Sequence, residues 1–195
     1  MKRNKQWIII FGTCLLLLLA ACGNSPENKN SGENSGIKTQ EKTDASAHEG
    51  HHKSGSGEVP ENLKKAENPT YKVGSHAIIE ADHMEGMKGA KATITGAYDT
   101  IAYTVTYKPT TGAEEVKNHK WVIQEEIKNA DEAPLEPGTE VVLEANHMDG
   151  MKGATATIDS AEKTTVYMVD FVPTTGGEEI KNHKWVTESE LSPVD

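Results

Sequence analysis

The chain has 195 residues, with 30 Asp and Glu against 20 Lys and Arg, and a formal net charge of −10 at pH 7. This acidic balance excludes nucleic-acid binding, because gripping phosphate requires Lys and Arg, and the only arginine, Arg3, lies in a segment that we expect to be removed. An acidic surface instead raises the local concentration of cations.

Residues 1–21 are predicted to be a lipoprotein signal peptide. A basic start is followed by an apolar run at residues 7–19, which has the length of a signal-peptide hydrophobic region and is short for a membrane span. The run ends in Leu-Ala-Ala-Cys, which resembles a bacterial lipobox. We therefore expect cleavage before Cys22, lipidation of its sulfur, and a lipid-anchored protein on the extracellular face of the cell membrane. Cys14 leaves with the signal, so the mature chain has no disulfide.

Residues 22–68 are predicted to be a disordered linker, because Gly, Ser, Asn, Lys and Glu dominate and cannot bury enough apolar surface to offset the entropy of ordering. Within it stand His48, His51 and His52. Three imidazoles in five residues can capture Cu(II) or Zn(II) weakly. The alternative, accidental histidines in a solvated tail, stays open.

An internal repeat follows: residues 71–127 align without a gap to residues 135–191, with identity at about half of the positions. Each repeat contains one His-Met-x-Gly-Met-Lys-Gly-Ala motif, at residues 83–90 and 147–154. Each also contains one Lys-Asn-His-Lys-Trp-Val motif, at residues 117–122 and 181–186. We expect residues 128–134 to be a short linker between two repeat domains.

Both repeats show the period-two pattern of β-strands. Apolar and polar residues alternate at residues 77–81, 90–94 and 101–107, and again in the second repeat, between turns that contain Gly and Pro. We therefore predict an all-β protein with two tandem small SH3-like β-barrels, each with the His-Met loop between its first two strands. Because units of this size are marginally stable alone, the two should pack on each other in a monomer.

The His-Met loops offer a soft donor set. Thioether sulfur binds zinc and hard ions poorly but suits Cu(I), and imidazole binds copper in either oxidation state. Gly86 permits the tight bend that lets two methionines face a common point. The predicted copper ligands are His83, Met84, Met87, His147, Met148 and Met151.

The second motif is predicted to complete the first. In a closed barrel the last strand returns beside the first, so His119 and His183 would join the sites, and the indoles of Trp121 and Trp185 would cover the bound cation. Other interpretations remain open: methionine is a common core filler, tryptophan is commonly buried, and an Asn-His pair can satisfy the backbone of a turn.

At these residues the chain resembles the YdhK family of Firmicute lipoproteins, whose relatives include the copper-binding lipoprotein CopL. The lipobox, the His-containing linker and the doubled motifs carry the resemblance, which covers the whole mature chain. It implies a membrane-tethered extracellular copper-binding protein with a tandem β-domain that contributes to copper resistance.

The leading hypothesis is a non-enzymatic lipoprotein that sequesters copper, chiefly Cu(I), or passes it to a copper exporter or multicopper oxidase. The competing hypothesis is an SH3-like module that binds cell-wall peptidoglycan, with Trp121 and Trp185 stacking on sugar. An enzyme is disfavoured, because no nucleophile stands beside a base and no carboxylates are paired in a motif.

Overall fold

The computed structural model describes residues 54–130 and 134–195, which lie within one compact unit, Ala45–Asp195. The predicted signal peptide, Cys22 and the linker histidines His48, His51 and His52 lie outside the described residues. Within these residues the predicted all-β class is confirmed, and no helix is long and apolar enough to span a membrane. The elements are β1 (His76–Ile79), β2 (Lys91–Tyr107), β3 (Val116–Ile123), the 3-10 helix η1 (Gln124–Glu126), β4 (Glu140–Val142), β5 (Thr155–Phe171), β6 (Ile180–Thr187), the 3-10 helix η2 (Glu188–Glu190) and β7 (Leu191–Pro193).

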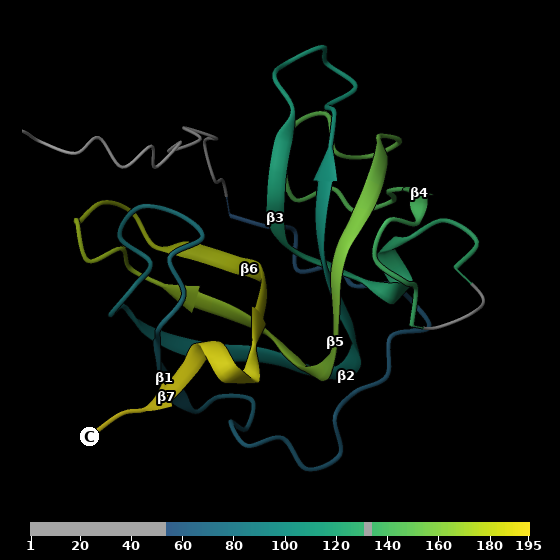
Figure 1. Ribbon diagram of the computed structural model, residues 1–195. Helices are drawn as coiled ribbons and strands as arrows, with labels where there is room; N and C mark the ends of the chain where they lie inside the picture. The colour runs from purple at the N-terminus through teal and green to yellow at the C-terminus, as the bar shows by residue number, and fades with distance from the viewer. Residues whose placement is uncertain (1–53, 131–133) are drawn as a thin grey trace, which may run out of the picture. The chain divides into compact units, whose positions relative to one another are not determined.

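Two long strands, β2 and β5, organise the sheet. Each has 17 residues, and they pair antiparallel from Ala92 opposite Phe171 to Tyr107 opposite Ala156, with two register shifts. Because β2 and β5 are equivalent strands of the two repeats, this pairing relates the repeats by an approximate two-fold axis. Figure 1 shows β1, β6 and β7 gathered at one end of this pair and β3 and β4 at the other.

The pairing makes each hydrophobic core from halves of both repeats. We call lobe A the part formed by residues 76–97 and 166–193, and lobe B the part formed by residues 101–127 and 140–158. The core of lobe A joins Ala77, Ile79, Met87, Ala90, Ala92 and Ile94 of the first repeat to Tyr167, Val169, Phe171, Ile180, Val186 and Leu191 of the second. The core of lobe B joins Tyr103, Val105, Tyr107, Val116, Val122 and Ile127 to Leu143, Ala145, Met151, Ala154, Ala156 and Ile158.

This exchange arises because β2 does not turn back at its centre. The sequence pattern suggested separate strands around residues 90–94 and 101–107, but the residues between them also pair with β5. One continuous strand therefore enters both lobes. The two repeats contact each other as predicted, and they do so by sharing both cores.

The strand order of lobe A is β7-β1-β2-β5-β6, and the His-Met loop lies between β1 and β2 as predicted. The predicted closed barrels are corrected, because the sheet does not close. In lobe A, η2 joins β6 to β7, and β7 pairs with β1 over three residues. In lobe B the equivalent pairing is a single bridge, Ile127 to Leu143.

Residues 54–68 fall in the predicted linker, but the structure places them against the sheet. Lys65 forms a bridge with Tyr98, and Leu63 is buried in a third apolar cluster between the lobes, which also contains Trp121 and Trp185. Val59 packs on the same cluster. These few aliphatic side chains explain why the ordered part starts before residue 68, since each buries apolar surface.

Candidate functional site

The His-Met loops are held by turns of the other repeat. Gly86 has a φ of +74°, and its carbonyl oxygen accepts a hydrogen bond from the Thr174 N–H at 2.8 Å. A Cβ at Gly86 would lie 2.6 Å from Thr175 Oγ1, so only glycine suits both the φ angle and the close approach. The Thr110 N–H bonds the carbonyl of Gly150 in the same way at 2.9 Å.

Site A forms around Glu190, in η2. The side chain of His83 is 8% exposed, and its Nε2 lies 2.8 Å from Glu190 Oε1. Trp121 donates its indole N–H to Oε2 of the same carboxylate at 2.8 Å, and Lys120 Nζ lies 3.5 Å from Oε1. One carboxylate therefore joins the His-Met motif and the Asn-His-Lys-Trp motif of the first repeat.

Site B is the equivalent arrangement around Glu126, in η1. His147 Nε2 lies 2.7 Å from Glu126 Oε1, and Trp185 donates its indole N–H to Oε2 at 3.0 Å. The ring of His119 lies beside that of His147, with 6.4 Å between centroids. Site B thus brings two imidazoles together, one from each repeat.

The strands β3 and β6 each direct side chains into both lobes. On β3, His119 faces His147 in site B, while Trp121, two residues later, reaches Glu190 in site A. On β6, Trp185 reaches Glu126 in site B, while His183 packs edge to face on Phe171 in lobe A, with centroids 5.8 Å apart. The two motifs meet at His119 and His147 and, through the indole–carboxylate bonds, at Glu190 and Glu126, whereas His183 lies on Phe171.

Both carboxylates are held in the ionised form. Burial alone would raise the pKa of Glu190, but hydrogen bonds and the charge of His83, with bonds from Trp121 and the Thr187 N–H, lower it to about 2. Burial likewise opposes ionisation of Glu126, yet His147, Trp185 and the Ile123 N–H bring its pKa below the usual value. An ionised carboxylate only accepts hydrogen bonds, so the histidine Nε2 atoms must donate.

This geometry determines which imidazole nitrogens are available to a ligand. When Nδ1 gives up its proton, as binding a ligand there requires, His83 and His147 keep the Nε2–H bond to the carboxylate and each present a lone pair at Nδ1. Both Nδ1 atoms are buried and have no hydrogen-bond partner among residues 54–130 and 134–195. Buried polar atoms are seldom left unsatisfied, so these two nitrogens are the candidate positions for a ligand.

Acid should weaken the folded state through Glu190. Its pKa is about 2 in the folded protein against 4.5 ordinarily, so ionised Glu190 stabilises the fold above pH 4.5, and this contribution is lost as the pH falls from 4.5 towards 2. Urea unfolding across this range should show a shallower loss of stability for Glu190→Gln than for the parent. The exposed Glu61→Gln serves as the control, and equal slopes in parent and Glu190→Gln would contradict the assignment.

The four predicted methionine ligands divide into two pairs. Met87 and Met151 are fully buried, in the cores of lobes A and B. Met84 and Met148 are only partly buried, and the hydroxyl of Tyr107 lies 3.9 Å from the Met148 sulfur. Burial raises the pKa of Tyr107 to about 12, so this hydroxyl keeps its proton and donates to the sulfur.

Truncating the buried methionines should mainly affect stability. Met87→Ala and Met151→Ala each remove a fully buried side chain and are expected to cost about 2–5 kcal/mol of unfolding free energy. Met84→Ala and Met148→Ala, which are partly exposed, should cost less. Urea titrations of the four variants test this, and equal costs in all four would show that the partly buried pair is also structural.

Glu126 and Glu190 were not among the residues predicted from the sequence. The signal was present, because the two occupy equivalent positions of the repeat, whereas the preceding residues, Glu125 and Ser189, differ. The bound cation that we expected over each indole has a counterpart in the structure: Lys120 Nζ lies 5.2 Å from the Trp121 ring centroid, and Lys184 Nζ 5.7 Å from that of Trp185.

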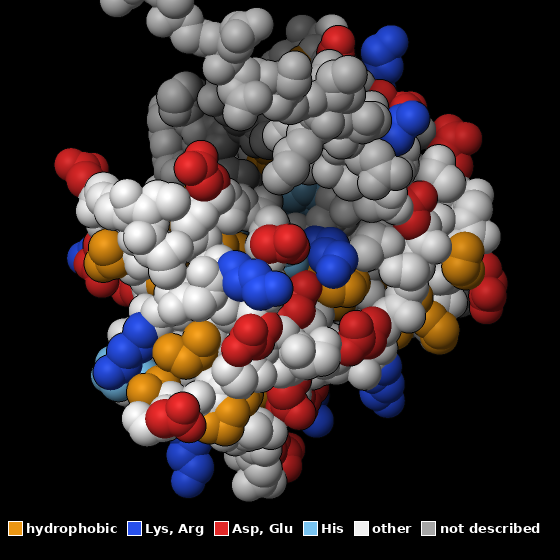
Figure 2. All heavy atoms as spheres, turned by 60° about the vertical axis from the view of Figure 1, so that its left-hand side comes forward, with side chains coloured by type: hydrophobic (Ala, Val, Ile, Leu, Met, Phe, Trp, Pro, Cys, Tyr) orange, Lys and Arg blue, Asp and Glu red, His pale blue; other side chains and the backbone are white. Residues whose placement is uncertain are grey.

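The donors available to a metal are few and soft. Among residues 54–130 and 134–195, no three His, Cys, Asp or Glu side chains are grouped to hold a metal ion. A metal bound at Nδ1 of His83 or His147 would therefore have to draw on thioethers, on His119 or His183, or on both. Figure 2 shows histidine set back in a hollow, bordered by lysine and acidic side chains.

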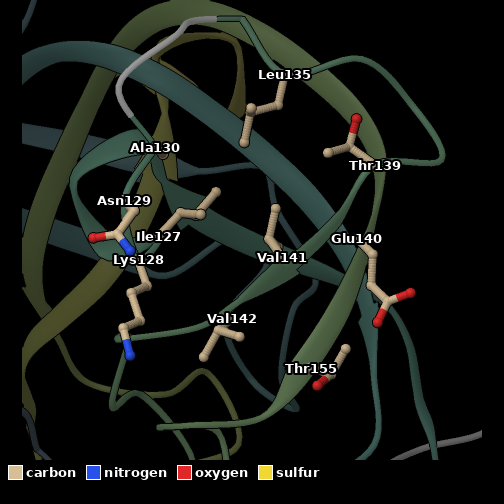
Figure 3. A pocket seen from close by; sticks show the side chains of 10 residues that line it. All are labelled: Ile127, Lys128, Asn129, Ala130, Leu135, Thr139, Glu140, Val141, Val142 and Thr155. Atoms are coloured by element: carbon tan, nitrogen blue, oxygen red, sulfur yellow. The ribbon is translucent and has the colours of Figure 1, made fainter.

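A pocket of about 530 Å³ lies elsewhere, beside β4 (Figure 3). It occurs in lobe B, where Ile127 and Leu143 form only a single bridge. The equivalent edge in lobe A is covered by β7, which pairs with β1. The side chains around it are Ile127, Lys128, Asn129, Ala130, Leu135, Thr139, Glu140, Val141, Val142 and Thr155. None of the predicted ligands is among them.

The fold and the site define the class of protein. It is an all-β protein of two interlocked repeats, in which a buried cluster of histidine, carboxylate and indole occurs twice. The family described as "Protein of unknown function (DUF1541)" matches residues 73–124 and 137–188, one match for each repeat. The chain belongs to this family.

The chain is similar to proteins from Bacillus subtilis. It is 57% identical over 192 residues to "Uncharacterized protein YdhK" of strain 168, covering 98% of this chain and 91% of that protein. A crystal structure of a DUF1541 family protein (ydhK) of the same strain matches with a TM-score of 0.68 at 67% identity, covering 69% of this chain and 92% of the other. A solution NMR structure of the ydhK C-terminal domain matches with a TM-score of 0.59 at 69% identity, covering 62% and 92%.

Proposed function

We propose that this protein binds copper, chiefly Cu(I), at the extracellular face of the cell membrane, where a lipid on Cys22 anchors it. It would sequester the metal or hand it to an exporter or multicopper oxidase, and so contribute to copper resistance without acting as an enzyme. The histidines at residues 48–52 would add a weaker site for Cu(II) or Zn(II).

The observation that carries this proposal is the orientation of His83 and His147. Each ring directs Nε2 to a buried carboxylate, at 2.8 and 2.7 Å, and leaves Nδ1 buried without a hydrogen-bond partner among the described residues. Metal-binding histidines characteristically donate their other ring N–H to a carboxylate, which orients the ring and increases its basicity. Glu190 and Glu126 supply this support.

The remaining donors favour Cu(I) over other ions. Met84 and Met148 follow directly after the two histidines and are partly buried, so their sulfurs are the nearest thioethers in the sequence. In site B the ring of His119 is 6.4 Å from that of His147, and two imidazoles bound to one ion at about 2.0–2.1 Å have ring centres roughly 6 Å apart. Nitrogen and thioether donors without a third His, Cys or carboxylate suit Cu(I).

The alternative of cell-wall binding receives no support from the indoles. Trp121 is 6% exposed and Trp185 is fully buried, and each indole N–H is bonded to a carboxylate. A ring that stacks on sugar needs an open face, and neither indole presents one.

An anaerobic Cu(I) titration of residues 23–195 against a chromogenic Cu(I) chelator tests the proposal. The parent should take up two tightly bound equivalents, one for each site. A variant with His83, Met84, His147 and Met148 changed to alanine should lose them, while His76→Ala, an exposed histidine outside both sites, should bind like the parent. Equal uptake by parent and fourfold variant would remove these loops from the function, and absence of uptake by the parent would refute copper binding.

A further inference from the structure

Two equivalent lysines have unequal partners in the structure. Lys120 lies 3.5 Å from Glu190 in site A. By the repeat, Lys184 should pair with Glu126 in site B, but among the ion pairs of the described residues that contact does not occur. Lys184 Nζ instead donates a hydrogen bond to the backbone carbonyl of Glu58.

The diversion is caused by a segment that we call the N-terminal strap, residues 54–58. Gly55 donates its N–H to the Lys181 carbonyl at 2.7 Å, and Ser54 Oγ accepts from the Lys181 N–H at 3.0 Å. The Asn182 side-chain amide donates to the Gly55 carbonyl at 3.2 Å. The strap therefore lies along the start of β6, and its last residue holds Lys184.

The strap packs closely against β6 of the second repeat. A Cβ at Gly55 would lie 2.6 Å from the Asn182 carbonyl oxygen, closer than a side chain tolerates. Within residues 54–130 and 134–195, no segment makes the equivalent hydrogen bonds to the start of β3. The internal symmetry of the two sites is broken at this point.

We propose that Lys120 and Lys184 make the two sites unequal, because the strap holds Lys184 away from Glu126 while Lys120 stays on Glu190. This inference rests on the proposed binding of Cu(I). A metal ion at His147 faces Glu126, which has no lysine in ion-pair contact and interacts with Lys184 only at longer range. An ion at His83 faces a carboxylate that already has a lysine beside it, and the lysine repels a second cation.

The consequence is ordered loading, with site B filling before site A. One extra positive charge a few ångströms away, partly screened, corresponds to about a tenfold difference in affinity. Displacing the strap should release Lys184 to Glu126 and bring the two affinities together.

The test is a Cu(I) titration of ¹⁵N-labelled residues 23–195, followed by the indole N–H signals. This form contains only Trp121 and Trp185, whose indoles bond Glu190 and Glu126 and so report on sites A and B separately. In the parent, at one equivalent of Cu(I) the Trp185 signal should have shifted by about three quarters of its full change and the Trp121 signal by about one quarter, and both should be complete at two equivalents. Simultaneous shifts, or the reverse order, would overturn the proposal.

Three variants separate the causes. Gly55→Val, which displaces the strap, should weaken site B towards site A and move the Trp185 indole signal even without metal. Ser56→Thr, on an exposed strap residue, keeps the hydroxyl that accepts from the Glu58 N–H and should preserve the order. Lys120→Met should raise the Cu(I) affinity of site A about tenfold, because it removes the lysine beside Glu190. The two affinities then become equal and the order of loading is lost. Retained order in both Gly55→Val and Lys120→Met would refute the role of the lysines. If the parent binds no Cu(I), the proposed function fails first, and the ordering falls with it.

Discussion

Glu126→Gln is expected to lower Cu(I) affinity at site B by about 10- to 100-fold and leave site A unchanged, because changes in a residue that supports a ligating histidine have effects of this size. The glutamine has almost the same shape, but it carries no charge and cannot hold His147 Nε2–H and the Trp185 indole N–H equally well. Titration against a Cu(I) chelator should then show one tight equivalent in place of two.

The same change should destabilise the fold. Glu126 is 6% exposed and accepts bonds from His147, Trp185 and the Ile123 N–H, and a buried hydrogen bond to a charged group typically contributes about 1.5–3 kcal/mol. The matched control is Glu125→Gln, one residue earlier, which loses the charge of a half-buried carboxylate bonded to Thr100 Oγ1. Copper uptake by Glu126→Gln equal to that of Glu125→Gln would remove Glu126 from the site.

Separating the two repeats is expected to abolish folding of either one as a monomer. Residues 54–130 alone would lack Tyr167, Val169 and Phe171 from the core of lobe A, and residues 134–195 alone would lack Tyr103, Val105 and Tyr107 from that of lobe B. In each fragment, one hydrogen-bonding edge of a 17-residue strand would also lose its partner strand. Monomeric fragments should therefore give poorly dispersed NMR spectra and no cooperative urea transition.

Mixing the two fragments should restore the fold, because all contacts of both lobes are then available. The control is the intact protein with a protease site inserted between Ala130 and Pro134 and cut after folding, which should keep its spectrum. The long strand of either fragment offers an edge for self-association, so the mass of each fragment in solution is measured together with its spectrum. A folded monomer of residues 134–195 would contradict the shared cores.

Much of the local structure could be predicted from the pattern of residues. Alternation at residues 77–81 and 101–107 indicated strands, and the glycines and prolines between them indicated turns, because period two and turn chemistry are local properties. The place of the His-Met loop, between β1 and β2, followed from the same pattern. The repeat predicted that every feature of one site would have an equivalent in the other.

The candidate site was predicted only in part. His83 and Met84, like His147 and Met148, are neighbours in one loop and are both partly buried, which motif spacing could predict. Met87 and Met151 belong to the same motifs, yet both are fully buried in the cores. Spacing within a loop does not distinguish a thioether that faces a ligand from one that fills a core, because both need an apolar, flexible side chain.

The amino-acid sequence alone determined the β class, the two repeats and the donor types, since these depend on composition and on neighbours along the chain. The exchange of halves between lobes, the support of His83 by Glu190 and of His147 by Glu126, and the diversion of Lys184 by the strap emerged only in the tertiary structure. His83 and Glu190 are 107 residues apart, and Lys184 and Glu58 are 126 apart. Such contacts are set by how β2 pairs with β5, and pairing between distant strands leaves no signal in either strand read separately.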